Sequence, residues 1–268
     1  MLIPLEGSWA LIFGVSSGMG RAAARALAAA GCHIVGVHFD LAAGQEQADE
    51  LAVELRTAGV QAHLFNRNLT DPQARADIPA LLRDLTGSAG VRVVLHSVAF
   101  GSLLPFVPAV GDAGRGKAIT LTQQAMTSEV MAHSLVYWTQ DLLAAGLLGT
   151  GSKIYAMTSS GGTRVLANYG AVSAAKAALE AHCRQLAAEL APRGIAVNAI
   201  RAGITDTPAL RKIPGSDQVL RRCAGINPHG RLTTAEDVAE AIVALSLSNS
   251  SWITGNVIGV DGGEALVA

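Results

Sequence analysis

The sequence predicts a single-domain α/β protein, a Rossmann-like doubly wound sheet of seven parallel strands with helices on both faces. Short apolar runs alternate with longer, alanine-rich segments along the 268 residues, and this alternation favours parallel strands joined by right-handed helical crossovers. A glycine-rich stretch, residues 14–20, follows the first apolar run and opens the first helix-like segment. No internal repeat, low-complexity tract or linker rich in Pro, Gly or Ser divides the chain, so we expect one domain over residues 1–268.

The expected strands are short runs that are apolar almost throughout, as in a parallel sheet covered on both faces. In chain order they are residues 9–13, 33–37, 60–65, 91–96, 153–157, 195–200 and 256–260. The expected helices lie between them and have the length and composition of helices. They are residues 21–30, which Gly31 stops, and residues 44–58, 71–85, 128–145, 169–191 and 234–247.

Two irregular stretches, residues 101–127 and 202–226, each follow an expected strand. Open α/β sheets bind ligands at the carboxyl edge of their strands, where such stretches begin. We therefore interpret residues 101–127 as a substrate loop and residues 202–226 as a mobile substrate lid.

Composition excludes several classes of protein. A net charge of −1 argues against general nucleic-acid binding, and no run approaches the roughly 18 apolar residues of a membrane span. The first residues lack the basic and apolar regions of a signal peptide, so we expect a cytoplasmic protein. The three scattered cysteines, Cys32, Cys183 and Cys223, suit reduced thiols and predict neither a disulfide frame nor a metal site.

The glycine-rich stretch predicts a dinucleotide site. Glycines at this place let the backbone turn tightly and approach a pyrophosphate, whose charge then lies at a helix N-terminus. A plain tight turn is the alternative, but the strand before the loop and the helix after it favour a cofactor site. The residues of the loop that we expect to bind the cofactor are Gly14, Ser16, Ser17, Gly18, Met19 and Gly20.

Asp40, at the end of the second strand, predicts which dinucleotide binds. A carboxylate there accepts hydrogen bonds from ribose hydroxyls and repels a 2′-phosphate. We expect no Arg or Lys near this strand end and therefore a preference for NADH over NADPH, although Asp40 as a simple turn cap is the alternative. Asn68 and Leu69, after the third strand, are candidate adenine contacts or an ordinary turn.

Tyr169 and Lys176 are separated by seven residues, 176 − 169, which is close to two helical turns. Both side chains can therefore project from one helix face toward one ligand. A phenol can donate a proton to a developing oxyanion, and a neighbouring ammonium can hold a cofactor sugar and ease that donation. A packed ring and a solvated amine are the alternative interpretation of this pair.

Together these residues resemble the short-chain dehydrogenase/reductases, and within them the enoyl-acyl-carrier-protein reductases. The general resemblance lies in the glycine loop, in residues 197–200 leading to Gly203 and Thr207, and in the Val-Asp-Gly-Gly of residues 260–263. The specific resemblance lies in His-Ser-Val-Ala-Phe at 96–100, in Asn168 and residues 204–210, and in the Tyr-to-Lys spacing. Ordinary members space that pair four apart, where this chain has Val172.

Two departures place the resemblance in a minority subgroup. The main group of enoyl reductases has a second Tyr where this chain has Ser159, and it has a longer glycine loop. Ordinary members use a serine at this place to orient or polarise a carbonyl, so Ser159 is a third candidate catalytic residue beside Tyr169 and Lys176.

The resemblance implies reduction of the 2,3 double bond of trans-2-enoyl thioesters by NAD(P)H, on acyl carrier protein or coenzyme A, in fatty acid or related acyl synthesis. Carbonyl reduction or alcohol oxidation in the same fold is the first alternative, and a catalytically inactive dinucleotide sensor is the second. The resemblance also implies a homotetramer, a loop-shaping role for His96, and further cofactor contacts at Ser97, Lys176, Gly203, Thr205 and Thr207.

Basic residues concentrate in and near the expected lid of a chain whose charge is otherwise balanced. Acyl carrier proteins are strongly acidic, so charge complementarity predicts a docking patch here, with a solvated face as the alternative. The residues are Arg201, Arg211, Lys212, Arg221, Arg222 and Arg231. We also expect Asp206 and Arg164 to pair near the site.

Overall fold

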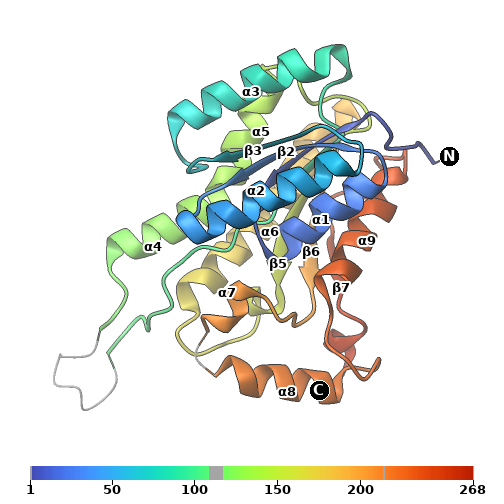
Figure 1. Ribbon diagram of the computed structural model, residues 1–268. Helices are drawn as coiled ribbons and strands as arrows, with labels where there is room; N and C mark the ends of the chain where they lie inside the picture. Colours follow the sequence, from blue (N-terminus) through green and yellow to red (C-terminus); the bar gives the residue numbers. More distant parts are fainter. Residues whose placement is uncertain (1, 109–116, 214, 268) are drawn as a thin grey trace.

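The computed structural model describes residues 2–108, 117–213 and 215–267 and confirms the predicted fold class (Figure 1). The described residues form one sheet of seven strands in the order β3-β2-β1-β4-β5-β6-β7, with every neighbouring pair parallel. The strands are β1 (Trp9–Phe13), β2 (His33–His38), β3 (Ala62–Asn66), β4 (Val93–His96), β5 (Lys153–Ser159), β6 (Ala196–Ala202) and β7 (Val257–Val260).

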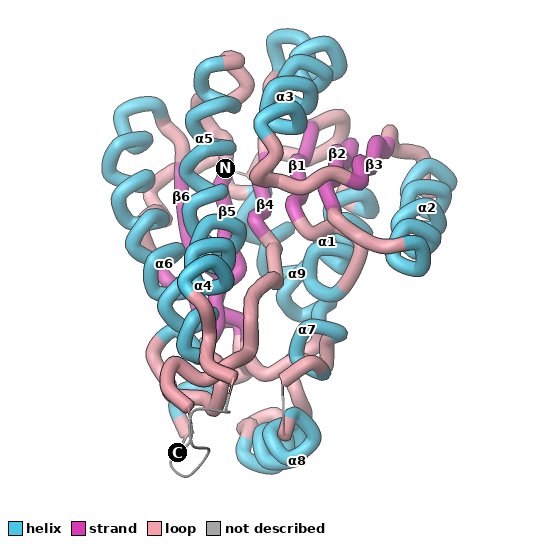
Figure 2. The backbone as a smooth tube through the Cα atoms, turned by 90° about the vertical axis from the view of Figure 1, so that its left-hand side faces the viewer, coloured by secondary structure: helices cyan, strands magenta, loops and turns pink. Residues whose placement is uncertain are grey.

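Helices cover both faces of the sheet (Figure 2). One face carries α1 (Gly18–Ala29), α2 (Ala42–Thr57) and α9 (Ala235–Leu247), and the other carries α3 (Pro72–Thr86), α5 (Ser134–Ala144) and α6 (Gly170–Leu190). Alternate residues of β1 enter the two cores: Leu11 packs with α3, α5 and α6, whereas Ile12 packs with α1, α2 and α9. No helix in the described ranges has the length and apolar character needed to cross a membrane.

The helix expected at residues 128–145 begins earlier than predicted, so the substrate loop is shorter than residues 101–127. Helix α4 (Leu121–Ser128) starts after Thr120, whose hydroxyl accepts from the Gln123 backbone while the Gln123 side chain accepts from the Thr120 backbone. This reciprocal cap stabilises a helix start that apolar periodicity does not mark. A π-helical turn, Glu129–His133, then joins α4 to α5. Residues 109–116 of the expected loop lie outside the described residues.

The expected irregular lid contains two short helices, α7 (Pro208–Arg211) and α8 (Ser216–Ile226). They follow the carboxyl end of β6, and α8 lies below the strands in Figure 1. Only Ser216 and Leu220 of α8 are buried, so the segment carries little of the apolar signal by which the other helices were predicted. The lid prediction is thus wrong in secondary structure, although its place at the carboxyl edge is as expected.

Candidate cofactor and catalytic site

The predicted site residues follow the carboxyl ends of six neighbouring strands. The glycine loop follows β1 and Ser97 follows β4, and these strands flank the point where the strand order reverses. Doubly wound sheets bind ligands at this switch point. Asp40 follows β2, Asn68 follows β3, Ser159 ends β5, and the lid begins where β6 ends.

The glycine loop is folded so tightly that its key positions have no room for a side chain. Gly14 has φ 79°, and a Cβ there would collide with the Ser97 carbonyl oxygen. A Cβ on Gly20 would collide with the Gly14 carbonyl in turn. Glycine is therefore required at both positions for the tight turn that the sequence predicts.

The first turn of α1 presents backbone N–H groups that no side chain caps. Ser17 is the N-cap residue, with φ −149°, but its hydroxyl makes no capping hydrogen bond. Ser16 is buried, and Met19 packs against the core beneath the helix. The uncapped N–H groups and the helix dipole suit an anion such as a pyrophosphate.

The start of the lid meets the glycine loop. The Thr207 hydroxyl caps α7 by accepting from Leu210 N at 3.2 Å, and its methyl carbon lies 3.7 Å from where a Gly18 Cβ would be. Thr205 is buried and donates to Gly203 O at 3.0 Å, and Gly203 N donates to Val260 O at 3.0 Å. Thr207 therefore lies beside the glycine loop, while Gly203 and Thr205 are held by hydrogen bonds near the ends of β6 and β7.

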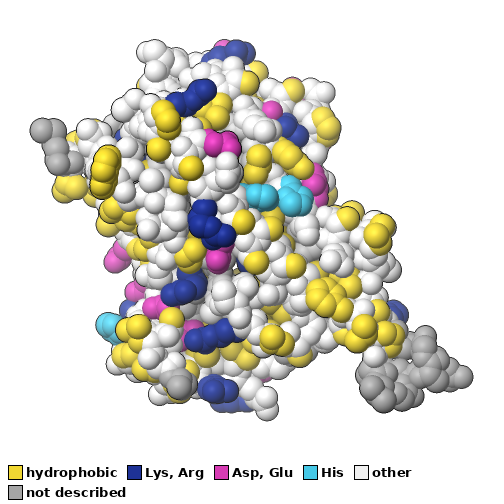
Figure 3. All heavy atoms as spheres, turned by 180° about the vertical axis from the view of Figure 1, so that it is seen from behind, with side chains coloured by type: hydrophobic (Ala, Val, Ile, Leu, Met, Phe, Trp, Pro, Cys, Tyr) yellow, Lys and Arg dark blue, Asp and Glu magenta, His cyan; other side chains and the backbone are white. Residues whose placement is uncertain are grey.

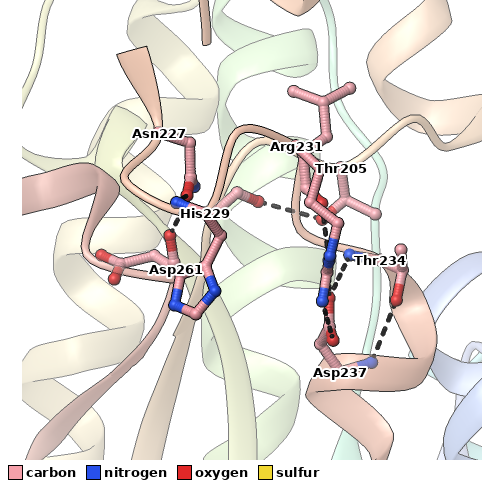
Figure 4. A network of polar contacts seen from close by, with 9 residues as sticks. Thr205, Asn227, His229, Arg231, Thr234, Asp237 and Asp261 are labelled. Carbon is pink, nitrogen blue, oxygen red and sulfur yellow. Dashed lines mark hydrogen bonds and ion pairs between the residues drawn. The ribbon is translucent and has the colours of Figure 1, made fainter. Parts of the chain in front are cut away.

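A polar network holds the base of the lid (Figure 4). Asn227, at the end of α8, donates from Nδ2 to Asp261 O at 2.9 Å and accepts at Oδ1 from His229 N at 2.9 Å. Arg231 pairs with Asp237 through two hydrogen bonds of 2.6 and 2.8 Å. These bonds attach the C-terminal end of the lid to the segment after β7 and to α9.

Asp40 lies at a corner braced by its neighbours. Its Oδ2 bonds to Nδ1 of His38 at 2.9 Å, and its backbone N and O bond to the Asn66 side chain at 3.1 and 2.8 Å. The expectation that no basic residue lies near this strand end is wrong. Arg67 is exposed and donates its backbone N–H to His38 O at 2.7 Å, because β3 ends beside β2.

The two candidate adenine contacts have structural partners of their own. Asn68 Oδ1 accepts from both the N–H and the hydroxyl of Thr70 at 3.0 Å, which is a local turn. Leu69 is buried, and its carbonyl accepts from Trp138 Nε1 at 2.8 Å. Contact with adenine stays a prediction for both residues.

Tyr169 stands at the start of α6, where it is the N-cap residue. Asn168, just before it, has φ 60°, a left-handed conformation that Asn tolerates better than most residues. The ring lies so close to Gly161 that a Cβ there would be 2.6 Å from Cε1. Burial raises the pKa of Tyr169, and the neighbouring Ser159 hydroxyl opposes that rise, so the phenol stays protonated and able to donate.

Lys176 is 6% exposed, which excludes the solvated amine. Its Nζ donates to Met157 O at 2.6 Å. Burial lowers the pKa of Lys176 to about 8, against the opposing influence of Glu180 and Cys183. Both predicted catalytic groups therefore lie at the last residues of β5, Lys176 at Met157 and Tyr169 near Ser159.

His96 is fully buried and serves the local structure. Ser134 donates its hydroxyl proton to Val130 O at 2.8 Å, so Nε2–H of His96 is the donor to Ser134 Oγ, also at 2.8 Å. Burial and the nearby Lys176 charge lower the pKa of His96 to about 3. A neutral, enclosed imidazole fits the loop-shaping role that the sequence predicts.

Some residues that support the site carry no local signal in the sequence. Glu264 is buried near the C-terminal end and accepts at Oε2 from Ile204 N, at the start of the lid, at 2.9 Å. No local signal marks a pair 60 residues apart. Asp206 pairs with Arg211, at 2.6 and 2.5 Å, and not with Arg164 as expected. The described residues contain no cluster of three or more His, Cys, Asp or Glu side chains placed to hold a metal ion.

Fold and site together define a dinucleotide-binding oxidoreductase, and comparison with known proteins gives the family. A family model described as "Enoyl-(Acyl carrier protein) reductase" matches residues 14–264. The chain is 33% identical over 258 residues to cis-4-hydroxycyclohexanecarboxylate dehydrogenase of Sinomonas cyclohexanicum, covering 96% of each chain. It therefore belongs to the short-chain dehydrogenase/reductase family, in the enoyl-acyl-carrier-protein reductase branch.

Solved structures agree with this assignment. The enoyl-acyl-carrier-protein reductase (NADH) of Aquifex aeolicus superposes with a TM-score of 0.81 at 25% identity, covering 98% of both chains. A short chain dehydrogenase of Burkholderia cenocepacia, solved in complex with NADP, superposes with a TM-score of 0.80 at 27% identity, covering 98% of this chain and 100% of that one.

Proposed function

We propose that this protein reduces the 2,3 double bond of trans-2-enoyl thioesters with NADH or NADPH. The observation that carries the proposal is the place of the phenol. Tyr169 stands at the start of α6 beside Ser159, whereas Val172, four residues before Lys176, is buried in the core. The donor is thus seven residues from the lysine, as in the enoyl reductases that the sequence resembles.

The spacing suits the chemistry of a conjugated thioester. In ketone reduction the atom that accepts hydride carries the oxygen that is protonated, whereas in enoyl reduction the charge develops on an oxygen three atoms away. Three residues along a helix correspond to about 4.5 Å, at about 1.5 Å per residue. Moving the tyrosine by three residues therefore displaces the donor by a distance of the required size.

The residues present fit a nicotinamide dinucleotide, which when bound would supply hydride to the β-carbon. The glycine loop and the N-terminus of α1 would hold the pyrophosphate. Lys176 would bind the ribose hydroxyls, and its charge would favour an oxyanion nearby. Tyr169 would donate a hydrogen bond to the thioester oxygen as the enolate develops. Between the two cofactors we propose NADH, because Asp40 repels a 2′-phosphate. Arg67 reduces the expected preference for NADH over NADPH.

Exposed apolar side chains near Tyr169 suit the binding of an acyl chain. Large hydrophobic side chains remain exposed on three segments around the site: Phe100, Phe106, Val107, Leu121, Met126, Val165 and Leu166. The Phe106 ring lies against Gly170, where a Cβ would be 2.5 Å away. Figure 3 shows hydrophobic side chains gathered at the lower right of the rear face. Exposed apolar patches of this kind mark ligand sites more often than plain surface.

Carbonyl reduction or alcohol oxidation is the second candidate, and the contact between Ser159 and Tyr169 favours it. Cofactor oxidation monitored with crotonyl-coenzyme A, and then with a β-ketoacyl thioester, tests both. We expect activity with the first substrate. Activity with the second alone would replace the proposal by the second candidate, and activity with neither would favour a dinucleotide-sensing protein.

The lid offers a smaller cationic patch than the sequence indicates. Arg211 pairs with Asp206 and Asp217, Arg231 pairs with Asp237, and Arg201 lies 3.9 Å from Asp261. Within the described residues, Lys212, Arg221 and Arg222 form no ion pair and are exposed. We propose that these three residues attract an acidic acyl carrier protein. As a further proposal, the chain forms a homotetramer, which light scattering after size exclusion would test.

Charge reversal tests the docking patch. Arg221→Glu with Arg222→Glu should raise the KM for acyl-carrier-protein substrates by about tenfold or more, since each change turns attraction into repulsion. The KM for coenzyme A thioesters should change by less than about twofold, because α8 itself stays folded. Arg193→Glu, at the opposite edge of the sheet, is the matched control. An equal rise for both kinds of substrate would contradict docking at α8.

A further inference from the structure

A buried histidine holds the carboxylate at the end of β2. His38 is 3% exposed, and its Nδ1 lies 2.9 Å from Asp40 Oδ2. An ionised carboxylate only accepts hydrogen bonds, so Nδ1–H of His38 is the donor. The other oxygen, Asp40 Oδ1, accepts no hydrogen bond from any described residue, and the side chain is 30% exposed.

The surroundings fix the direction of this pair. Val37 enters the core on the side of α3, so His38, one residue later, points to the side of α1 and α2. The glycine loop is bound to the same strand end, with Gly14 N donating to Val37 O at 2.8 Å. Gly44, in the first turn of α2, makes room for the carboxylate, since a Cβ there would be 2.7 Å from Oδ1.

His38 carries a buried polar atom that does not stabilise the fold. Its Nε2 is buried and has no hydrogen-bond partner among the described residues. An unpaired buried polar atom destabilises a protein, whereas an apolar side chain of similar size would pack there without that cost. The bond to Asp40 is the one side-chain hydrogen bond that His38 makes with the described residues.

We propose that His38 is a positioning residue for the cofactor. This proposal rests on the dinucleotide site of the proposed function. By tethering Oδ2 it directs Oδ1 of Asp40 to accept from an adenosine ribose hydroxyl, without the loss of side-chain freedom on binding. A carboxylate held in this place also opposes a 2′-phosphate, so the pair sets the preference for NADH against the nearby Arg67 cation.

A double-mutant cycle on cofactor affinity tests the proposal. Dissociation constants for NADH and NADPH are measured by titration calorimetry, with no acyl substrate, for the wild type, His38→Ala, Asp40→Ala and the double variant. We expect His38→Ala to weaken NADH binding by about three- to tenfold, the worth of one positioned hydrogen bond, and to change NADPH binding by less than about twofold. The double variant should match Asp40→Ala alone, because His38 acts only through Asp40.

Two further variants keep the test falsifiable. His38→Asn, whose amide N–H can replace Nδ1–H, should restore most of the NADH affinity. His33→Ala, at the other end of the same strand, should leave both affinities unchanged. Equal weakening of both cofactors, or effects that add in the double variant, would overturn the positioning role. A wild type that binds neither cofactor would overturn the dinucleotide site itself, so the two failures are distinguishable.

Discussion

Replacing Tyr169 by phenylalanine should lower kcat for enoyl-thioester reduction by about 10²- to 10⁴-fold, the usual worth of a positioned proton donor. The phenol is the group beside Ser159 that can meet a developing oxyanion, and burial raises its pKa, so it remains protonated under assay conditions. Phenylalanine keeps the ring against Gly161 and removes only the hydroxyl. The loss should therefore appear in kcat and leave the fold intact.

Binding measurements separate this role from a structural one. The dissociation constant for the cofactor should change by less than about threefold in Tyr169→Phe, because Lys176 and the glycine loop are untouched. Tyr137→Phe is the matched control, since that phenol lies on α5 and bonds Glu129 at 3.4 Å. Turnover of Tyr169→Phe within about tenfold of the wild type would contradict the catalytic assignment.

The sequence contains the fold and the frame of the site because these depend on local patterns. Continuous apolar runs mark the strands, and the glycine loop and the Tyr-Lys spacing are readable within a few residues of chain. The position of Arg67 near Asp40 could not be predicted from local sequence. It arises from the pairing of β2 with β3, in which His38 faces Asn66. Helices α7 and α8 were not predicted because they bury few residues and therefore lack an apolar pattern. The cationic patch is smaller than predicted because Arg211 and Arg231 pair with acidic residues five or six positions away along the chain.

Replacing Lys176 by methionine should weaken cofactor binding by about tenfold or more and yet stabilise the protein. The ammonium would lose its charge-assisted hydrogen bonds to the ribose. In the folded protein, however, burial lowers its pKa from 10.5 to about 8. At roughly 1.4 kcal/mol per unit, this difference destabilises the folded state by about 3 kcal/mol at neutral pH. Methionine removes that cost and leaves Met157 O without its donor, so the net gain should be roughly 1–2 kcal/mol.

The pH dependence of stability gives the sign of the effect. Between pH 8 and 10.5 the unfolded lysine binds more protons than the folded one, so the wild type becomes more stable as pH rises through this window. The advantage of Lys176→Met should therefore be full below pH 8 and shrink toward pH 10.5. Urea unfolding at pH 7 and pH 10 measures both values, with the exposed Lys212→Met as control. The opposite result would be a variant that is less stable than the wild type at pH 7 and has the same pH profile. It would show that Lys176 has an ordinary pKa in the folded protein and is not buried beside Met157.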